Sequence, residues 1–138
     1  MNEKFLDFVR KYKDLRLAVA VSGGVDSVCL LHWLAVAGMN ITALHVNHGL
    51  RDAADTETKY VADLCQKLNV PYQIFYWTGE KPSSGLEAAA RDARYKFMTD
   101  WCVENNINAL MVAHQADDQI ETFLMNLSRG SGVYGLSA

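Results

Sequence analysis

The sequence predicts an α/β fold, an open parallel sheet with helices on both faces. Four short segments of strand character alternate along the chain with longer segments of helical periodicity. The first of these strand segments, residues 17–21, is apolar throughout, as in strands that are buried on both faces. A regular strand–helix alternation is typical of parallel strands joined by right-handed crossovers.

Each element follows from its own pattern. The expected strands are residues 17–21, 41–46, 72–77 and 109–113, and the expected helices are residues 2–13, 27–38, 52–69, 86 to about 105, and 117 to about 128. The first helix places Phe5, Phe8 and Tyr12 at helical spacing, and Pro71 ends the third. Residues 78–85 form the one long loop. Residues 130–138 are punctuated by glycine, and we expect no regular element there.

Composition limits the classes of protein. The 138 residues suffice for one domain with a substantial core. The net charge is −3, from 13 basic and 16 acidic residues, so we do not expect this chain alone to grip a long nucleic-acid backbone.

The cysteines and the hydropathy favour a soluble, cytoplasmic protein. Cys29, Cys65 and Cys102 are far apart and form no CxxC pair, so we expect reduced thiols in or beside the core rather than a zinc or dithiol site. The N-terminus has no signal-peptide pattern, and no apolar run approaches the roughly 18 residues of a membrane span.

The segment SGGVDS, residues 22–27, directly follows the first strand and predicts a phosphate-binding loop. A glycine-rich turn that opens a helix directs backbone N–H groups into one concavity, which suits an anion. The segment lacks the lysine of a Walker loop and the third glycine of a dinucleotide fingerprint. Asp26 would repel a phosphate unless a cation lay between them, which indicates Mg²⁺. The alternative is a tight turn in which Asp26 or Ser27 only caps the helix.

Two further polar segments follow strands. HVNHGLR, residues 45–51, ends the second strand, and HQADDQIET, residues 114–122, follows the fourth. Ligands bind beyond the carboxyl ends of parallel strands, so the three segments meet in one cleft if the first and fourth strands are neighbours. In a helix, Asp117 and Glu121 would lie one turn apart on one face. Alternatively, these acids only complement the helix dipole.

The long helix offers two arginines. Glu87, Arg91 and Arg94 fall within about 60° of one another on a helical projection. They form either a solvated, salt-bridged face or an arginine pair that faces the cleft and suits phosphate.

The loop SGGVDS resembles the PP-loop of the N-type ATP pyrophosphatases, a family with an adenine nucleotide alpha hydrolase-like, Rossmann-like fold. The resemblance implies that ATP is bound so that a substrate attacks its α-phosphate while pyrophosphate stays in the loop. Together with HVNHGLR, GLEAAARDARY and HQADDQIETFLMNLSRGSGVYGL, the loop resembles the tRNA(Ile)-lysidine synthetases within that group. This resemblance implies ATP-dependent adenylation of the wobble cytidine in tRNA(Ile) with a CAU anticodon. L-lysine then attacks and expels AMP, which makes lysidine.

The resemblance also implies roles for single residues. Nucleotide binding falls to Ser22, Gly23, Gly24, Val25, Asp26, Ser27, His45, Asn47 and His48, and the magnesium ligand is Asp26. The implied catalytic residues are Asp26, Arg94, His114, Asp117 and Asp118, with Glu121 in support. Members of the family continue beyond a region of this length, so we expect residues 1–138 to be an N-terminal part of the catalytic domain, without the domains that hold tRNA. A second copy of the chain, as in a homodimer, is a further candidate partner.

Two other functions stay open. One is another PP-loop enzyme, such as a tRNA thiolase or an amide-forming synthetase, although the cytidine thiolases carry a CxxC that this chain lacks. The other is a nucleotide-binding module without catalysis, in which Asp117 and Asp118 would be dispensable.

Overall fold

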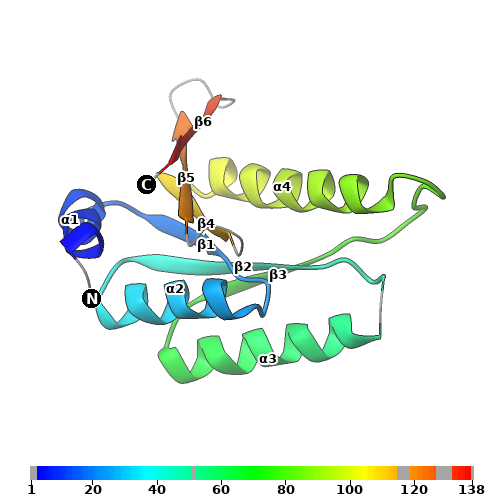
Figure 1. Ribbon diagram of the computed structural model, residues 1–138, viewed down its shortest axis with the longest axis horizontal. Helices are drawn as coiled ribbons and strands as arrows, with labels where there is room; N and C mark the ends of the chain where they lie inside the picture. Colours follow the sequence, from blue (N-terminus) through cyan, green and yellow to red (C-terminus); the bar gives the residue numbers. More distant parts are fainter. Residues whose placement is uncertain (1–2, 51, 115–118, 127–131, 138) are drawn as a thin grey trace.

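The computed structural model has one six-stranded sheet with helices on both faces (Figure 1). It describes residues 3–50, 52–114, 119–126 and 132–137. The elements in chain order are α1 (Glu3–Tyr12), β1 (Leu17–Ala20), α2 (Val25–Val36), β2 (Ile41–Asn47), α3 (Ala53–Leu68), β3 (Tyr72–Tyr76), α4 (Leu86–Glu104), β4 (Ala109–His114), β5 (Gln119–Asn126) and β6 (Gly132–Ser137). The strand order is β3-β2-β1-β4-β5-β6.

The first four strands are parallel, which confirms the predicted parallel sheet. Strand β1 lies between β2 and β4, and Leu17 is in register with both Ile41 and Ala109. The carboxyl ends of these strands therefore share one edge of the sheet. The strand order changes direction between β1 and β4, where this class of sheet usually binds its ligand.

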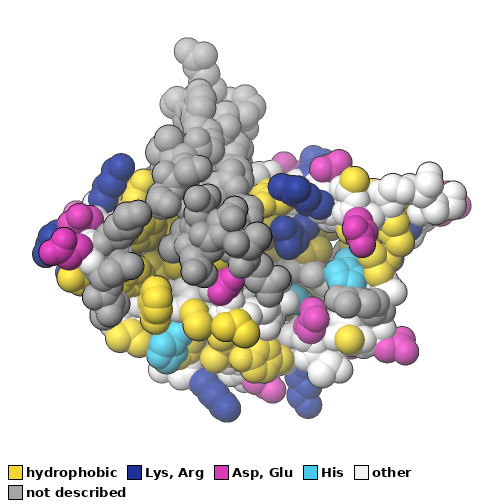
Figure 2. All heavy atoms as spheres, viewed as in Figure 1, with side chains coloured by type: hydrophobic (Ala, Val, Ile, Leu, Met, Phe, Trp, Pro, Cys, Tyr) yellow, Lys and Arg dark blue, Asp and Glu magenta, His cyan; other side chains and the backbone are white. Residues whose placement is uncertain are grey.

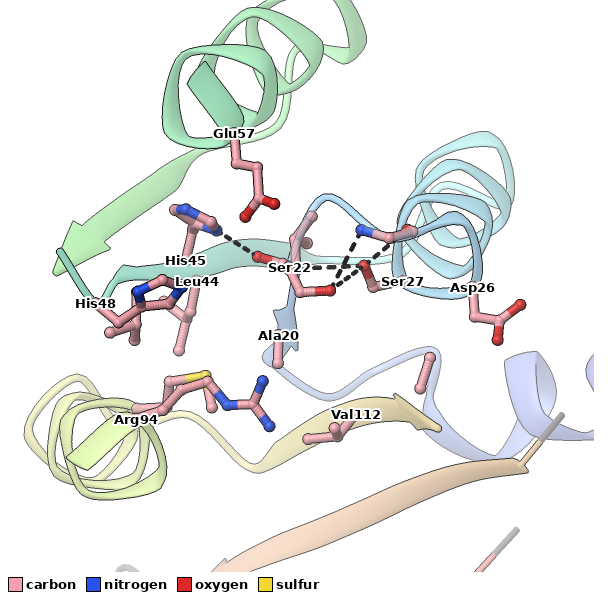
Figure 3. Close-up of a pocket in the computed structure, with 15 residues that line it drawn as sticks. Ala20, Ser22, Asp26, Ser27, Leu44, His45, His48, Glu57, Arg94 and Val112 are labelled. Atoms are coloured by element: carbon pink, nitrogen blue, oxygen red, sulfur yellow. Dashed lines mark hydrogen bonds between the residues drawn. The ribbon is translucent and has the colours of Figure 1, made fainter. Parts of the chain in front are cut away.

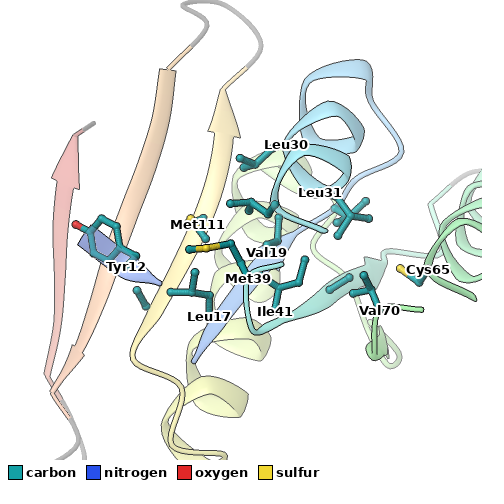
Figure 4. Close-up of a cluster of buried hydrophobic side chains, with 14 of the residues drawn as sticks. Tyr12, Leu17, Val19, Leu30, Leu31, Met39, Ile41, Cys65, Val70 and Met111 are labelled. Atoms are coloured by element: carbon teal, nitrogen blue, oxygen red, sulfur yellow. The ribbon is translucent and has the colours of Figure 1, made fainter. Parts of the chain in front are cut away.

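Alternate residues of the strands pack on opposite faces of the sheet. Leu17 and Val19 belong to a core shared with α1, α2 and α3 (Figure 4), whereas Ala18 and Ala20 pack with Met98 of α4. The two layers explain why β1 is apolar throughout. Helices therefore cover both faces, as the sequence predicts.

The chain after β4 differs from the prediction. Residues 119–126 form a strand rather than the expected helix, and residues 132–137 form a second strand where we expected no regular element. Strand β5 runs antiparallel to β4 and β6 antiparallel to β5, so the complete sheet is mixed. Strand β4 would otherwise leave an unpaired edge, and Ile, Thr and Phe in QIETFLMN favour an extended chain.

Two of the three cysteines lie in the core, as predicted. Cys65 and Cys102 are buried, and burial raises their pKa values to about 11 and about 12. Such thiols stay protonated and unreactive at neutral pH. Cys29, in contrast, is exposed on α2.

Among the described residues on the face that Figure 2 shows, the basic side chains form no single broad patch. Basic side chains are spread among acidic ones there, in keeping with the small net charge. Among the described residues, no helix is both long and apolar enough to cross a membrane.

Candidate active site

A cavity of about 530 Å³ opens at the carboxyl edge of the parallel strands, between the sheet and α4. Its walls come from the ends of β1, β2 and β4, from the loop between β1 and α2, and from α3 and α4 (Figure 3). The predicted convergence is thus confirmed for the segments that follow β1 and β2.

The loop between β1 and α2 is held together by hydrogen bonds between its serine hydroxyls and its own backbone. The backbone N–H of Ser22 donates to Ser27 Oγ at 3.1 Å, and Ser27 Oγ donates to the carbonyl of Gly24, also at 3.1 Å. The N–H of Gly24 donates to Ser22 Oγ at 3.3 Å. Gly23 has φ +87°, a conformation that glycine adopts without strain. Gly24 is extended, so only the first glycine needs this freedom.

The capping alternative for this loop is wrong. Gly24 is the N-cap of α2, and no side chain makes a capping hydrogen bond there. Asp26 lies in the first turn, is half-buried and lines the cavity. The first turn of a helix leaves backbone N–H groups without intrahelical partners, which keeps them available to an anion.

His45 points toward the loop but is already hydrogen-bonded on both sides. Nδ1 lies 2.7 Å from the carbonyl oxygen of Val21, and Nε2 lies 3.0 Å from Thr58 Oγ1. A carbonyl only accepts, so Nδ1 carries the proton. Burial lowers the pKa of His45, against smaller raising effects of the Val21 hydrogen bond and the Glu57 charge. The ring is therefore neutral at pH 7 and braces the site.

Asn47 and His48 shape the turn after β2. Asn47 donates from Nδ2 to Asp55 Oδ1 at 2.8 Å and accepts from the N–H of Gly49 at 2.9 Å. It is buried and does not line the cavity, so it supports the turn rather than facing a ligand. His48 does line the cavity, with Nδ1 accepting from the N–H of Leu50.

Arg94 faces the loop from α4. Figure 3 shows its guanidinium directed toward the loop, with His45 and Glu57 on the opposite side of the cavity. Its Nε is buried and has no hydrogen-bond partner among the described residues. Arg94 and Arg91 both contact the ring of Tyr95, at 5.3 and 5.7 Å, but only Arg94 lines the cavity. Within the described chain, no ion pair joins Glu87 to either arginine.

The α4 side of the cavity is apolar. Ala20, Leu44, Met98 and Val112 form this wall, one residue from each of β1, β2, α4 and β4. The small side chain of Ala20 leaves room over the sheet edge. An apolar wall beside a polar loop suits a ligand with a planar apolar base and a charged group.

Glu57 is a lining residue that the sequence analysis missed. It lies on α3, and its Cγ is 3.7 Å from where a Cβ on Gly23 would stand. It occupies one position in a helix rich in charged residues, and nothing in its spacing distinguishes it from a solvated side chain. Its neighbour Thr58 was missed for the same reason.

Other predicted site residues lie at the margin or outside the described chain. Gly23 shapes the loop, and Val25 is 72% exposed; neither lines the cavity. His114 ends β4 at the same sheet edge. Asp117 and Asp118 lie outside the described residues. The expectation that Asp117 and Glu121 share a helix face is wrong, because Glu121 belongs to strand β5.

The residues present fit Mg²⁺ only together with a bound phosphate. Among the described residues, no three His, Cys, Asp or Glu side chains are placed to hold a metal ion. Mg²⁺ is usually held by one or two carboxylates with substrate phosphates and water. Asp26, half-buried beside an anion-binding loop, has the chemistry for that role.

Curated relatives extend these observations. The chain is 49% identical over 123 residues to the tRNA(Ile)-lysidine synthase of Zymomonas mobilis subsp. mobilis, which covers 89% of this chain and 37% of that protein. It is 44% identical to the tRNA(Ile)-lysidine synthase of Wolbachia pipientis wMel, over 89% of this chain and 30% of that protein. The chain thus spans about a third of the length of these relatives.

Solved structures share the fold at low identity. A U34-tRNA thiolase from Methanococcus maripaludis superposes with a TM-score of 0.68 at 20% identity, covering 85% of this chain and 48% of that one. The NH3-dependent NAD synthetase of Campylobacter jejuni gives a TM-score of 0.61 at 22% identity, covering 80% and 52%. The PP-loop domain family matches residues 1–138 in full, so the chain belongs to that family.

Proposed function

We propose that the chain is the ATP-binding part of an enzyme that makes lysidine at the wobble cytidine of tRNA(Ile) with a CAU anticodon. The observation that carries this proposal is the cavity at the junction of β1 and β4, where the loop of residues 22–27 and Arg94 face each other. The identity to tRNA(Ile)-lysidine synthases supports the choice of substrate.

The cavity suits ATP in one orientation. The loop and the first turn of α2 receive the phosphates, and the wall of Ala20, Leu44, Met98 and Val112 receives the base. Asp26 would hold Mg²⁺, which would supply positive charge against the phosphates. Because the loop grips the β- and γ-phosphates, the α-phosphate is left facing the open side of the cavity.

Two displacements complete the reaction. The O2 of cytidine attacks the α-phosphorus, and the bond to the β-phosphate oxygen breaks, which releases pyrophosphate. Arg94 offsets the negative charge that develops on the α-phosphate. The ε-amine of lysine then attacks C2, the C2–O bond breaks, and AMP leaves. We assign the uptake of the amine proton to the group of His114, Asp117 and Asp118, with Glu121 in support.

Product analysis tests this proposal. With ATP labelled at the α-phosphate and no lysine, the complete enzyme that contains this chain should transfer label to a CAU tRNA and release pyrophosphate. A matched tRNA with uridine at the wobble position should stay unlabelled. Hydrolysis to ADP and phosphate would contradict α-phosphate attack, and ATP binding without turnover would favour a non-catalytic nucleotide-binding module.

A further inference from the structure

The peptide group between Val21 and Ser22 is held at both ends by side chains. It lies where the chain leaves the sheet, just after the N–H of Val21 donates to the carbonyl of Leu44 at 2.8 Å. The carbonyl of this peptide accepts from His45 Nδ1 at 2.7 Å, and its N–H donates to Ser27 Oγ at 3.1 Å. The orientation of this peptide plane, from which the phosphate loop starts, is therefore fixed.

His45 is in turn held by Thr58. The two side chains are 4% and 8% exposed, and Nε2 lies 3.0 Å from the threonine hydroxyl. With the proton on Nδ1, Nε2 is the acceptor and Thr58 the donor. The Val21 carbonyl thus selects the tautomer, and the Thr58 hydroxyl, which donates to Nε2, holds the ring in the orientation in which Nδ1 meets that carbonyl. Burial disfavours the charged ring, which keeps this tautomer populated at neutral pH.

These contacts form one chain of hydrogen bonds. It starts on α3 at Thr58, passes through His45 and the Val21–Ser22 peptide to Ser27, and ends at the carbonyl of Gly24, the N-cap of α2. Helix α3 is thereby connected to the start of α2 through the base of the loop, without a ligand.

We propose that Thr58 and His45 are positioning residues, which hold the phosphate loop in its binding shape and act through the loop rather than by touching the nucleotide. This assignment rests on the proposed function, because it needs a phosphate in the loop. His45 also lines the cavity, but both of its ring nitrogens are already hydrogen-bonded within the protein. The assignment also gives Thr58 a role that its place in the helix pattern does not reveal.

The expected effect is that of one lost buried hydrogen bond. In Thr58→Val, Nε2 loses its donor, and only the hydrogen bond to the Val21 carbonyl still orients the buried ring. The loop should then sample other shapes, and its affinity for phosphate should fall by about three- to tenfold. Thr58→Ser keeps the hydroxyl and should bind like the wild type. Thr56→Val, on an exposed position of the same helix, is the matched control.

Calorimetric titration with inorganic pyrophosphate and with ATP tests the proposal, at a temperature where all variants are folded. Weaker binding of both ligands by Thr58→Val alone, restored by Thr58→Ser, supports it. Equal affinities in Thr58→Val and the wild type overturn it. If the wild type binds neither ligand, the proposed function fails and this inference fails with it.

A second measurement needs no variant. The ¹⁵N shifts of the imidazole in the wild-type protein report which nitrogen carries the proton. Protonation at Nδ1 with an unprotonated Nε2 supports the hydrogen bond in which Thr58 donates to His45. A bare Nδ1 means that His45 cannot donate to Val21, and the proposal is then wrong.

Discussion

The hydroxyl oxygen of Ser27 lies 3.1 Å from the backbone nitrogen of Ser22. This hydrogen bond joins the first turn of α2 to the residue with which the loop begins. The same hydroxyl donates to the carbonyl of Gly24 and lies 3.3 Å from the Ser22 hydroxyl, which gives it three partner groups within the turn. The loop therefore has a defined shape before any phosphate arrives. A preorganised anion site avoids the cost of ordering backbone on binding.

Asp26→Asn should impair Mg²⁺-dependent ATP binding with little effect on stability. Asp26 makes no capping hydrogen bond, so its removal should cost at most about 1 kcal/mol from the helix dipole. The Mg²⁺ concentration needed for half-maximal ATP binding should rise by about tenfold or more. Titrating ATP at several Mg²⁺ concentrations measures this change.

Glu87→Gln is the control for Asp26. Glu87 is the first-turn acid of α4, is exposed and does not line the cavity. It should leave the Mg²⁺ requirement unchanged. An unaltered requirement in Asp26→Asn as well would remove Asp26 from the metal site.

Gly23→Ala should weaken phosphate binding, whereas Gly38→Ala should not. Both glycines have positive φ, +87° and +74°, and neither has a neighbour close enough to clash with an added Cβ. Each substitution should therefore cost about 1–2 kcal/mol of stability through backbone strain. Only Gly23 lies in the phosphate loop, so only its variant should also lose pyrophosphate affinity. Urea unfolding and titration of both variants check the pair, and equal affinities would mean that the loop does not hold the phosphate.

Arg94→Ala should reduce turnover far more than stability. The side chain makes no hydrogen bond at Nε with the described residues, so its loss leaves no partner there unpaired. The contact with Tyr95 is worth about 0.5–1 kcal/mol, and Arg91→Ala loses a contact of the same kind. Removal of charge stabilisation at the α-phosphate should slow turnover by about 10²–10³. Similar rates in the two variants would instead assign Arg94 a packing role.

The stability of the fold should fall as the pH drops below about 6.5 because of His45. Burial lowers its pKa in the fold below the ordinary value of 6.5, so the unfolded chain takes up the proton first. The contribution is complete above pH 6.5 and is lost progressively down to the lowered pKa, by at most about 1.4 kcal/mol per pH unit.

Urea unfolding between pH 5.5 and 7.5 measures this dependence. The slope with pH should be shallower in His45→Asn than in the wild type. His32→Asn, at an exposed position on α2, should keep the wild-type slope. A wild-type slope in His45→Asn would mean that the ring is not held neutral by burial.

Much of the fold is readable from local pattern. The apolar run of β1 predicts a strand buried on both faces, and Gly23 followed by Asp26 predicts an anion loop rather than a bare turn. The first inference is confirmed because it rests on a few consecutive residues, each of them buried, and the anion loop stays a prediction. The sequence predicts that the polar segments meet in one cleft only if β1 and β4 are neighbours. The structure shows that these two strands are paired.

The failures arise where tertiary context decides. The segment QIETFLMN has both helical and extended patterns, and pairing with the open edge of β4 selects the strand. His45 lines the cavity, as its place at the end of β2 suggests, but sequence does not reveal that Val21 and Thr58 occupy both ring nitrogens. Glu57 and Thr58 reach the site only because α3 packs beside the loop.

The most direct test of the central claim is mass spectrometry of digested tRNA after incubation with the complete enzyme of which this chain is proposed to be the ATP-binding part. Reactions contain ATP, Mg²⁺, lysine and a CAU-anticodon tRNA(Ile), with each component omitted in turn. The account predicts lysidine at the wobble position in the complete reaction and in no other. Unmodified cytidine after incubation with folded, ATP-binding protein would contradict it.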